Sequence, residues 1–167
     1  VGLNGASDPC AGAPVTAIDR AKATVHVGDT FVTGYDHLVL AVGSLPIRLP
    51  LPGGDLPGVV TFRDFADVAA IRKAAVEHAK VIVIGGGLLG LEAAYGLARA
   101  GGEVTLLHLV DRLMERQLDH EGAGLLAAAM AARGIDVRLR AETKGFRGDG
   151  QVEAVELADG TEIPADL

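Results

Sequence analysis

The sequence predicts an α/β fold, in which helices cover a parallel sheet and antiparallel β-meanders lie beside it. The first observation is an apolar strand at 81–84, a helical pattern at 88–100 and a second strand at 103–110. A strand–helix–strand unit of about 30 residues makes its two strands parallel. The second observation is an alternation of apolar and polar residues at 15–33 and 143–163, interrupted by turn residues. This alternation is typical of short antiparallel strands.

The domain organisation follows from the composition of the connecting segments. An apolar strand at 37–42 is expected after the first meander, and the stretch at 49–57 is dense in Pro and Gly. We expect a first, partial domain at 1–57, a connecting segment and helix at 58–79, and a second domain at 80–167 that lacks its last strand.

The remaining helices have recognisable ends. Asp64 or Asp67 can cap a helix that runs to about residue 78. An Ala- and Leu-rich helix is expected at 119–133, and Gly134 is a suitable residue to close it. The segment at 135–139 then supplies a third parallel strand.

Composition excludes several classes of function. The 167 residues carry a net charge of −7 without a cluster of Lys and Arg, which argues against nucleic acid as a partner. The apolar runs are too short to cross a membrane. Cys10 is the single cysteine and the five histidines are dispersed, so we expect no metal site and no internal disulfide. A reducing, cytoplasmic location fits best.

The motif that carries chemistry lies between the strand at 81–84 and the helix at 88–100. It matches G-x-G-x-x-G, in which the glycines allow a tight turn, a close approach to a pyrophosphate, and close helix–strand packing. The strand–turn–helix–strand context predicts a Rossmann-like NAD(P)-binding domain, with the helix N-terminus facing the phosphates. The cofactor-binding turn consists of Gly85, Gly86, Gly87, Leu88, Leu89 and Gly90.

The position that usually binds the ribose departs from this rule. An acidic residue is expected at the end of the second strand, where this chain has His108. His108 could bind a ribose hydroxyl and Arg112 a 2′-phosphate. Alternatively, His108 lies on the surface and Arg112 is a solvated charge, so NADH and NADPH both remain open.

Two further features are weaker. Glu92 lies in the first turn of the helix and must point toward the nicotinamide or the solvent, because a carboxylate would repel the pyrophosphate. A charged group after the second strand is more typical of a solvated helix face than of a site; it comprises Arg112, Glu115, Arg116 and Asp119.

A partial repeat links the two meanders. Residues 27–38 and 159–167 share a Gly-Asp or Asp-Gly turn and a later Asp in the same order. The first copy alone continues into an apolar strand, and the second copy alone has a glycine-rich unit before its meander. We infer a chain that contains the tail of one nucleotide-binding domain and most of a second.

The segments at 35–46, 58–63 and 81–92 resemble FAD-dependent pyridine nucleotide reductases. Within that family, residues 108–119 resemble the large subunit of NAD(P)H-dependent nitrite reductases. The resemblance implies an enzyme with an NAD domain inserted into a related FAD domain, in which hydride passes from NAD(P)H to FAD. It also implies an iron–sulfur cluster and sirohaem outside this chain, so that the chain alone does not reduce nitrite.

The resemblance also assigns residues to the site. Glu92 matches a glutamate near the nicotinamide, and the strand end at Ala41, Val42 and Gly43 matches an Ala-Thr-Gly sequence near the flavin. Val42 replaces the threonine and loses its hydroxyl.

Two alternatives remain, a ferredoxin or disulfide reductase and a non-catalytic dinucleotide-sensing or assembly protein. The expected partners are NAD(P)H and the FAD and electron-acceptor domains of the same polypeptide. The sequence does not decide between a monomer and an oligomer.

Overall fold

A computed structural model describes residues 12–28, 31–77 and 79–167, and Cys10 lies outside these residues. The chain divides into two compact units, Val1–Ser44 and Leu45–Leu167. The expected boundary at residue 57 differs from this division. Residues 45–57 group with the second unit because the carbonyls of Pro52 and Pro57 accept the N–H groups of Phe146 and Val152, each at 2.8 Å.

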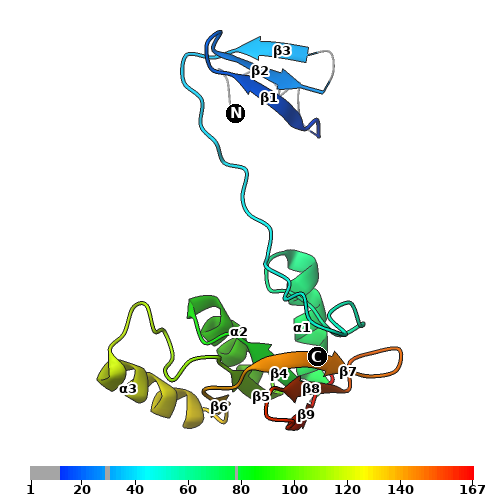
Figure 1. Cartoon of the computed structure of the whole chain (residues 1–167), viewed down its shortest axis with the longest axis vertical. Coiled ribbons are helices and arrows are strands. Elements are labelled where there is room, and N and C mark those ends of the chain that lie inside the picture. The colour runs from blue at the N-terminus through cyan, green and yellow to red at the C-terminus, as the bar shows by residue number, and fades with distance from the viewer. Residues whose placement is uncertain (1–11, 29–30, 78) are drawn as a thin grey trace. The chain divides into compact units, whose positions relative to one another are not determined.

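The first unit contains the expected antiparallel meander (Figure 1). Its strands are β1 (Val15–Asp19), β2 (Thr24–Val27) and β3 (Phe31–Gly34). Alternation in β2 buries Val25 and Val27 on one face of the sheet.

The expected strand at 37–42 does not form, and this segment has no regular secondary structure. Val39 and Val42 are 77% and 89% exposed. An apolar, β-branched run becomes a strand only when a neighbouring strand supplies hydrogen bonds and a buried face. The described residues of the first unit provide only β1, β2 and β3, which pair with one another.

The second unit is built around a parallel sheet of order β4-β5-β6. Helices follow each of the first two strands, as the periodicity predicted. The elements are α1 (Phe65–Val76), β4 (Lys80–Ile84), α2 (Leu88–Arg99), β5 (Glu103–Leu107), α3 (His120–Ala131) and β6 (Asp136–Arg138).

A capping box begins α1 and uses both aspartates that the sequence offered. Asp64 is the N-cap, and its carboxylate accepts the N–H groups of Ala66 and Asp67 at 2.8 and 2.9 Å. The Asp67 carboxylate accepts the Asp64 N–H in return. These bonds satisfy backbone donors that the first turn leaves without helical partners.

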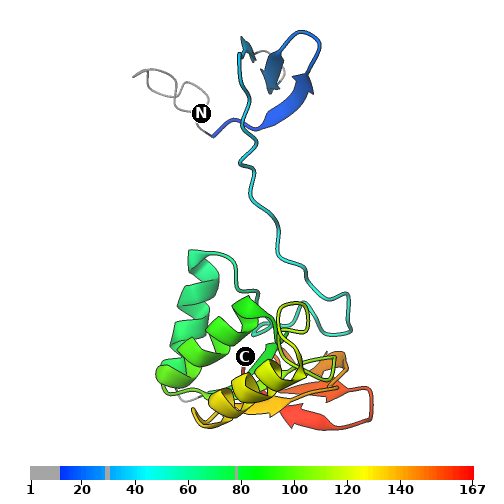
Figure 2. The same cartoon turned by 90° about the vertical axis from the view of Figure 1, so that its left-hand side faces the viewer.

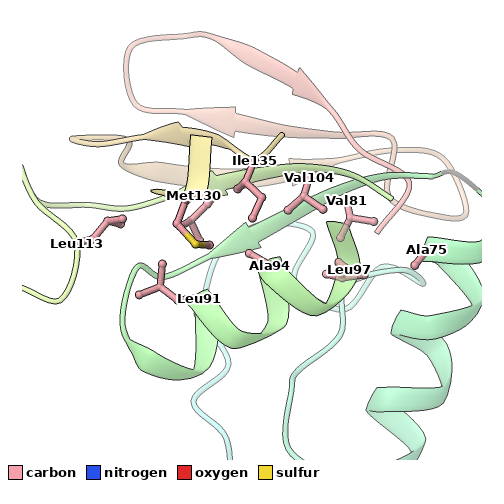
Figure 3. Packing of buried hydrophobic residues seen from close by; sticks show 10 residues of the cluster. Ala75, Val81, Leu91, Ala94, Leu97, Val104, Leu113, Met130 and Ile135 are labelled. Carbon is pink, nitrogen blue, oxygen red and sulfur yellow. The ribbon is translucent and has the colours of Figure 1, made fainter. Parts of the chain in front are cut away.

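The two faces of the parallel sheet bury different layers. On one face, Leu91, Ala94 and Leu97 of α2 point toward Val81 and Val104 of the sheet (Figure 3). Helix α3 adds to the same core, and Figure 2 shows α2 and α3 in front of the strands.

The opposite face of the sheet packs on the second meander. Its strands are β7 (Thr143–Arg147), β8 (Ala154–Leu157) and β9 (Glu162–Pro164), in that order. Leu107 of β5 is fully buried there with Val155 and Ile163. The sheet therefore lies between helices and a meander, and its strand ends carry the site.

The last residues of the chain follow the free edge of β4. The Asp166 N–H donates to the Lys80 carbonyl at 2.8 Å, and the Ile82 N–H donates to the Leu167 carbonyl at 2.9 Å. The Asp166 carboxylate also accepts the Lys80 N–H. In the described part of the chain, no helix is long and apolar enough to cross a membrane.

Candidate functional site

The glycine turn joins β4 to α2 at the carboxyl edge of the parallel sheet. Gly85 has φ +120°, a conformation that side chains other than glycine rarely adopt. Its N–H donates to the Leu107 carbonyl at 2.8 Å and extends the pairing with β5. A Cβ on Gly90 would overlap the Gly85 carbonyl oxygen, so the first turn of α2 lies directly against the turn. Gly85 and Gly90 thus each occupy a position that a side chain would disturb.

Gly87 begins α2 and leaves its end open. It is the N-cap, with φ −84° and ψ −179°, and no side chain caps this helix. A Cβ at Gly87 would meet no atom within 4 Å. The first helical bond runs from Leu91 N–H to the Gly87 carbonyl at 3.0 Å, so the preceding N–H groups have no partner of this kind. An uncapped N-terminus at the positive end of a helix dipole, with open space beside Gly87, fits an anion such as pyrophosphate.

Leu88 and Leu89 occupy the first helical positions with more than half of their side-chain surface exposed. Neither side chain belongs to the buried cluster that holds α2 on the sheet. Their contribution to an anion site is therefore the backbone N–H, and their side chains border the open end of α2.

His108 follows β5 and makes hydrogen bonds through both nitrogens of its buried ring. The Gly86 N–H donates to Nδ1 at 3.0 Å, and Nε2 lies 3.2 Å from Oε2 of Glu115. Because the backbone N–H of Gly86 can only donate, Nδ1 must accept. This places the proton of the neutral ring on Nε2. Nε2 then donates to the Glu115 carboxylate. The two nitrogens thus bind the glycine turn and the following loop, and the ring is buried rather than on the surface.

Glu115 is ionised at neutral pH. A hydrogen bond from its own backbone N–H is the main influence lowering the pKa of Glu115, and His108 and Arg116 lower it further. Partial burial opposes these effects but does not outweigh them. An ionised carboxylate is an acceptor only, which suits the Nε2 proton of His108.

The loop that follows β5 is fixed to Gly86 on a second side. The Met114 N–H donates to the Gly86 carbonyl at 3.0 Å, and Leu113 is fully buried beside it. A Cβ on Gly86 would lie 2.6 Å from Cδ2 of Leu113 and 2.8 Å from Cγ of His108. Both backbone groups of Gly86 are therefore occupied, and only glycine fits between these side chains.

The expected solvated helix face at this loop is not what the structure shows. Residues 109–118 form turns, Leu113 belongs to the core, and Asp119 caps α3 through the Gly122 N–H. Sequence reasoning missed the contributions of Leu113, Met114 and Glu115. The sequence signal that could have identified them is an apolar residue, Leu113, within a charged run directly after the second strand of the fingerprint unit.

Arg112 closes the same loop. Its Nη2 donates to the Glu115 carbonyl at 3.2 Å, and its Nη1 lies 3.4 Å from the Asp111 carboxylate and 3.5 Å from Nε2 of His120. Asp111 also pairs with Arg140 at 3.7 Å. The guanidinium thus holds the loop, while about a third of the side chain is exposed beside it.

The other predicted site residues are exposed. Glu92 lies on α2, and its side chain has no hydrogen bond or ion pair among the described residues. Ala41, Val42 and Gly43 lie in the irregular segment of the first unit, where Gly43 has φ +68°. No group of three or more His, Cys, Asp or Glu within residues 12–28, 31–77 and 79–167 could hold a metal ion.

Comparison with known proteins identifies the family. A family model described as pyridine nucleotide-disulphide oxidoreductase matches residues 3–167. The chain belongs to this family. Its members in the comparison include a nitrite reductase [NAD(P)H] of Bacillus subtilis, 43% identical over 92% of this chain and 19% of the relative. The ferredoxin–NAD(+) reductase subunit of a benzene 1,2-dioxygenase system from Pseudomonas putida is 36% identical over 93% of this chain and 38% of the relative.

A solved structure of the family supports the fold. The ferredoxin reductase for the CYP199A2 system from Rhodopseudomonas palustris matches with a TM-score of 0.84 and 29% identity, over 93% of this chain and 39% of that one. The chain therefore spans less than two fifths of these relatives. The resemblance to FAD-dependent pyridine nucleotide reductases is confirmed at the level of the family and its α/β fold.

Proposed function

We propose that this chain is the NAD(P)H-binding part of an FAD-dependent reductase, in which hydride passes from NAD(P)H to FAD. The observation that carries this proposal is the uncapped N-terminus of α2, where Gly87 has no side chain and a Cβ added there would meet no atom within 4 Å. Membership in a family of pyridine nucleotide oxidoreductases gives the N–H groups at this end a dinucleotide as their ligand. FAD, when bound, supplies the hydride acceptor.

Each part of the dinucleotide is assigned to particular residues. The turn of Gly85, Gly86, Gly87, Leu88, Leu89 and Gly90 holds the pyrophosphate, with Gly85 and Gly86 shaping the turn through their own hydrogen bonds and the N–H groups at the start of α2 donating to the anion. Glu92 lies on the nicotinamide side, and the Ala41–Gly43 segment lies on the FAD side. His108 and Arg112 border the ribose end, where an ionised Glu115 lies beside them. A carboxylate at this end suits the ribose hydroxyls of NADH, and a guanidinium suits the 2′-phosphate of NADPH, so we assign neither dinucleotide.

Nitrite is the electron acceptor that we favour for the whole protein. The nitrite reductase relative is 43% identical to this chain, against 36% for the ferredoxin reductase relative. Sirohaem and an iron–sulfur cluster then belong to other parts of the polypeptide, which works in the cytoplasm, and this chain alone is inactive toward nitrite. The second candidate is electron transfer to a ferredoxin, which the next relatives favour. A non-catalytic dinucleotide sensor is the third.

Calorimetric titration of the chain with NADH and with NADPH tests the binding proposal. We expect saturable binding of at least one of them, lost in Gly87→Val because the added side chain fills the space before the helix end. Gly96→Val in the same helix is the matched control, because a Cβ there also meets no atom within 4 Å but lies away from the turn. Absence of heat with both dinucleotides in folded chain, or unchanged affinity in Gly87→Val, contradicts the proposal.

The electron acceptor is tested in the complete protein. NAD(P)H oxidation is followed with nitrite and, separately, with reducible ferredoxin. Oxidation that depends on nitrite and yields ammonium supports the favoured acceptor. Turnover with ferredoxin alone supports the second candidate, and binding of NAD(P)H without turnover supports the third.

A further inference from the structure

We propose that His108 is a positioning residue of the anion-binding turn, in which its neutral ring holds the Gly86 N–H and Glu115 selects the tautomer that can do so. The proposal rests on dinucleotide binding at this turn. It assigns a new role to a residue that otherwise stands only in place of a ribose ligand.

The tautomer follows from the donors and acceptors around the ring. Gly86 offers a hydrogen to Nδ1 at 3.0 Å, and the Glu115 carboxylate, which can only accept, lies 3.2 Å from Nε2. A neutral ring with its proton on Nε2 satisfies both contacts at once. The opposite tautomer would place two hydrogens between Nδ1 and Gly86 and leave Nε2 facing a carboxylate without a hydrogen.

The consequence for anion binding follows from the position of Gly86. It lies directly before Gly87, the open N-cap of α2. His108 fixes the N–H of Gly86, and Met114 fixes its carbonyl. The peptide planes on both sides of Gly86 are therefore held, which keeps the N–H groups at the helix end in place before the ligand arrives.

Protonation of the ring removes this support. A doubly protonated imidazole has no acceptor, so Nδ1 would direct a hydrogen at the Gly86 N–H and leave a buried donor without a partner. Dinucleotide affinity is therefore expected to be lower for a protonated ring than for the neutral ring. A histidine that contacted the ligand simply as a cation would give the opposite sign, because its charge would attract the phosphates.

Several charged groups surround the ring and enter this balance. Glu115 faces Nε2, with Arg116 near its carboxylate. Arg112 and His120 lie behind Glu115. On the strand side, the backbone N–H of His108 donates to the Arg138 carbonyl. The Arg138 side chain pairs with Asp136, and Arg140 pairs with Asp111. Because Glu115 alone contacts the ring as a charge, it is the group whose replacement should alter the response.

The test measures the affinity of the full chain for ADP-ribose from pH 8 to pH 5.5, where the pyrophosphate diester keeps its charge. Any change that comes from protonation of the ring is expected to be a fall in affinity, because the protonated ring loses the bond to the Gly86 N–H. In His108→Asn, the amide oxygen can accept the Gly86 N–H near the place of Nδ1 without titrating. This variant should stay within about threefold of the unsubstituted chain at pH 8 and show no fall in acid. His108→Leu should bind about tenfold more weakly at every pH.

His120→Asn is the matched control, because His120 is exposed near Arg112 and does not contact the turn. It should follow the unsubstituted chain across the whole pH range. Affinity that rises in acid, or a fall in acid that persists in His108→Asn, overturns the proposal. ADP-ribose that fails to bind at any pH overturns the proposed function and this proposal together, whereas His108→Leu that binds as tightly as the unsubstituted chain overturns this proposal alone.

A second measurement needs no ligand. Nitrogen-15 NMR of the ring should show the Nε2-protonated tautomer for one histidine, and that signal should disappear in His108→Asn. In Glu115→Leu, the population of the Nε2-protonated tautomer should fall, because one of the two contacts that favour it is gone while the bond from the Gly86 N–H remains. An Nδ1-protonated His108 ring in the unsubstituted chain contradicts the proposal even if Glu115→Leu does not fold.

Discussion

The four glycines of the turn differ in what a side chain at each position would meet. Gly85 has a positive φ, Gly86 is enclosed by side chains, Gly87 faces open space, and Gly90 lies against a backbone oxygen. Substitution at Gly87 should therefore affect ligand binding without affecting the fold. Substitution at Gly90 should affect the fold first, because backbone atoms cannot move aside as a flexible side chain can.

Gly90→Ala is expected to destabilise the second unit by about 2 kcal/mol or more, because the methyl group would separate α2 from the turn. Gly96→Ala in the same helix should stabilise it by about 0.5–1 kcal/mol, since alanine favours a helix interior and the site is open. Urea unfolding followed by circular dichroism measures both. Equal stability of the two variants would show that α2 does not pack on the turn as described.

The fingerprint pattern alone was enough to predict where the turn lies, but not how its second glycine is held. The partners of His108 come from a turn 22 residues upstream and a loop residue seven positions downstream. Neither spacing matches a helical or strand period, and an imidazole nitrogen can donate or accept. The direction of the His108 ring therefore had to come from the three-dimensional structure.

At the scale of elements, sequence patterns identified the helices well because each carries its own signals. The capping aspartate of α1, the glycine turn before α2, and Asp119 before α3 each lie where a helix begins. The strand expected at 37–42 failed because a strand depends on a neighbour that local sequence does not show. Helices satisfy their backbone groups internally, and strands do not.

The second meander contains a group of ion pairs, between the buried Glu156 and two exposed basic side chains, whose contribution to stability depends on pH. The Glu156 carboxylate pairs with Lys144 at 2.9 Å and with Arg147. The hydrogen bond from Lys144 is the main influence lowering the pKa of Glu156; burial opposes it, and Arg147 lowers the pKa further. A carboxyl group with a lowered folded-state pKa contributes stability above its unfolded value of 4.5, and this contribution is lost as pH falls through the folded value.

Glu156→Gln is therefore expected to lower the melting temperature at pH 7 by a few degrees, with a difference that shrinks below pH 4.5. Thermal unfolding followed by circular dichroism between pH 7 and pH 3 measures this. Glu153→Gln is the control, because Glu153 is exposed on the same meander. A difference between Glu156→Gln and the unsubstituted chain that is constant with pH would assign the effect to packing instead.

At the scale of the whole molecule, the two meanders share a strand register. Both begin with a five-residue strand that has an irregularity at its second residue, and both pair this strand with one of four residues. Counting along the third strands by this register places Asp36 at the position of Asp166. The duplication expected from short sequence matches is therefore supported by strand pairing, which local similarity could not establish.

The two segments that follow the meanders differ in whether a neighbouring parallel strand is present. In the second unit, the residues after β9 bond to β4, which anchors them to the parallel sheet. The described residues of the first unit contain no parallel strand for the equivalent segment. Its apolar side chains are left exposed, with Val39, Leu40 and Val42 between 67% and 89% accessible.

Limited digestion with thermolysin tests this difference. Thermolysin cuts before bulky apolar residues in accessible, irregular backbone, so its first cuts are expected within 39–47, where both conditions hold. Mass spectrometry should identify a resistant product that ends at Leu167 and begins near the start of the second unit. Because the glycine turn and its supporting loop lie within that unit, the product should bind ADP-ribose with the affinity of the intact chain. First cuts within 80–167, or binding lost together with the first unit, would show that the second unit depends on the first for its fold or its site.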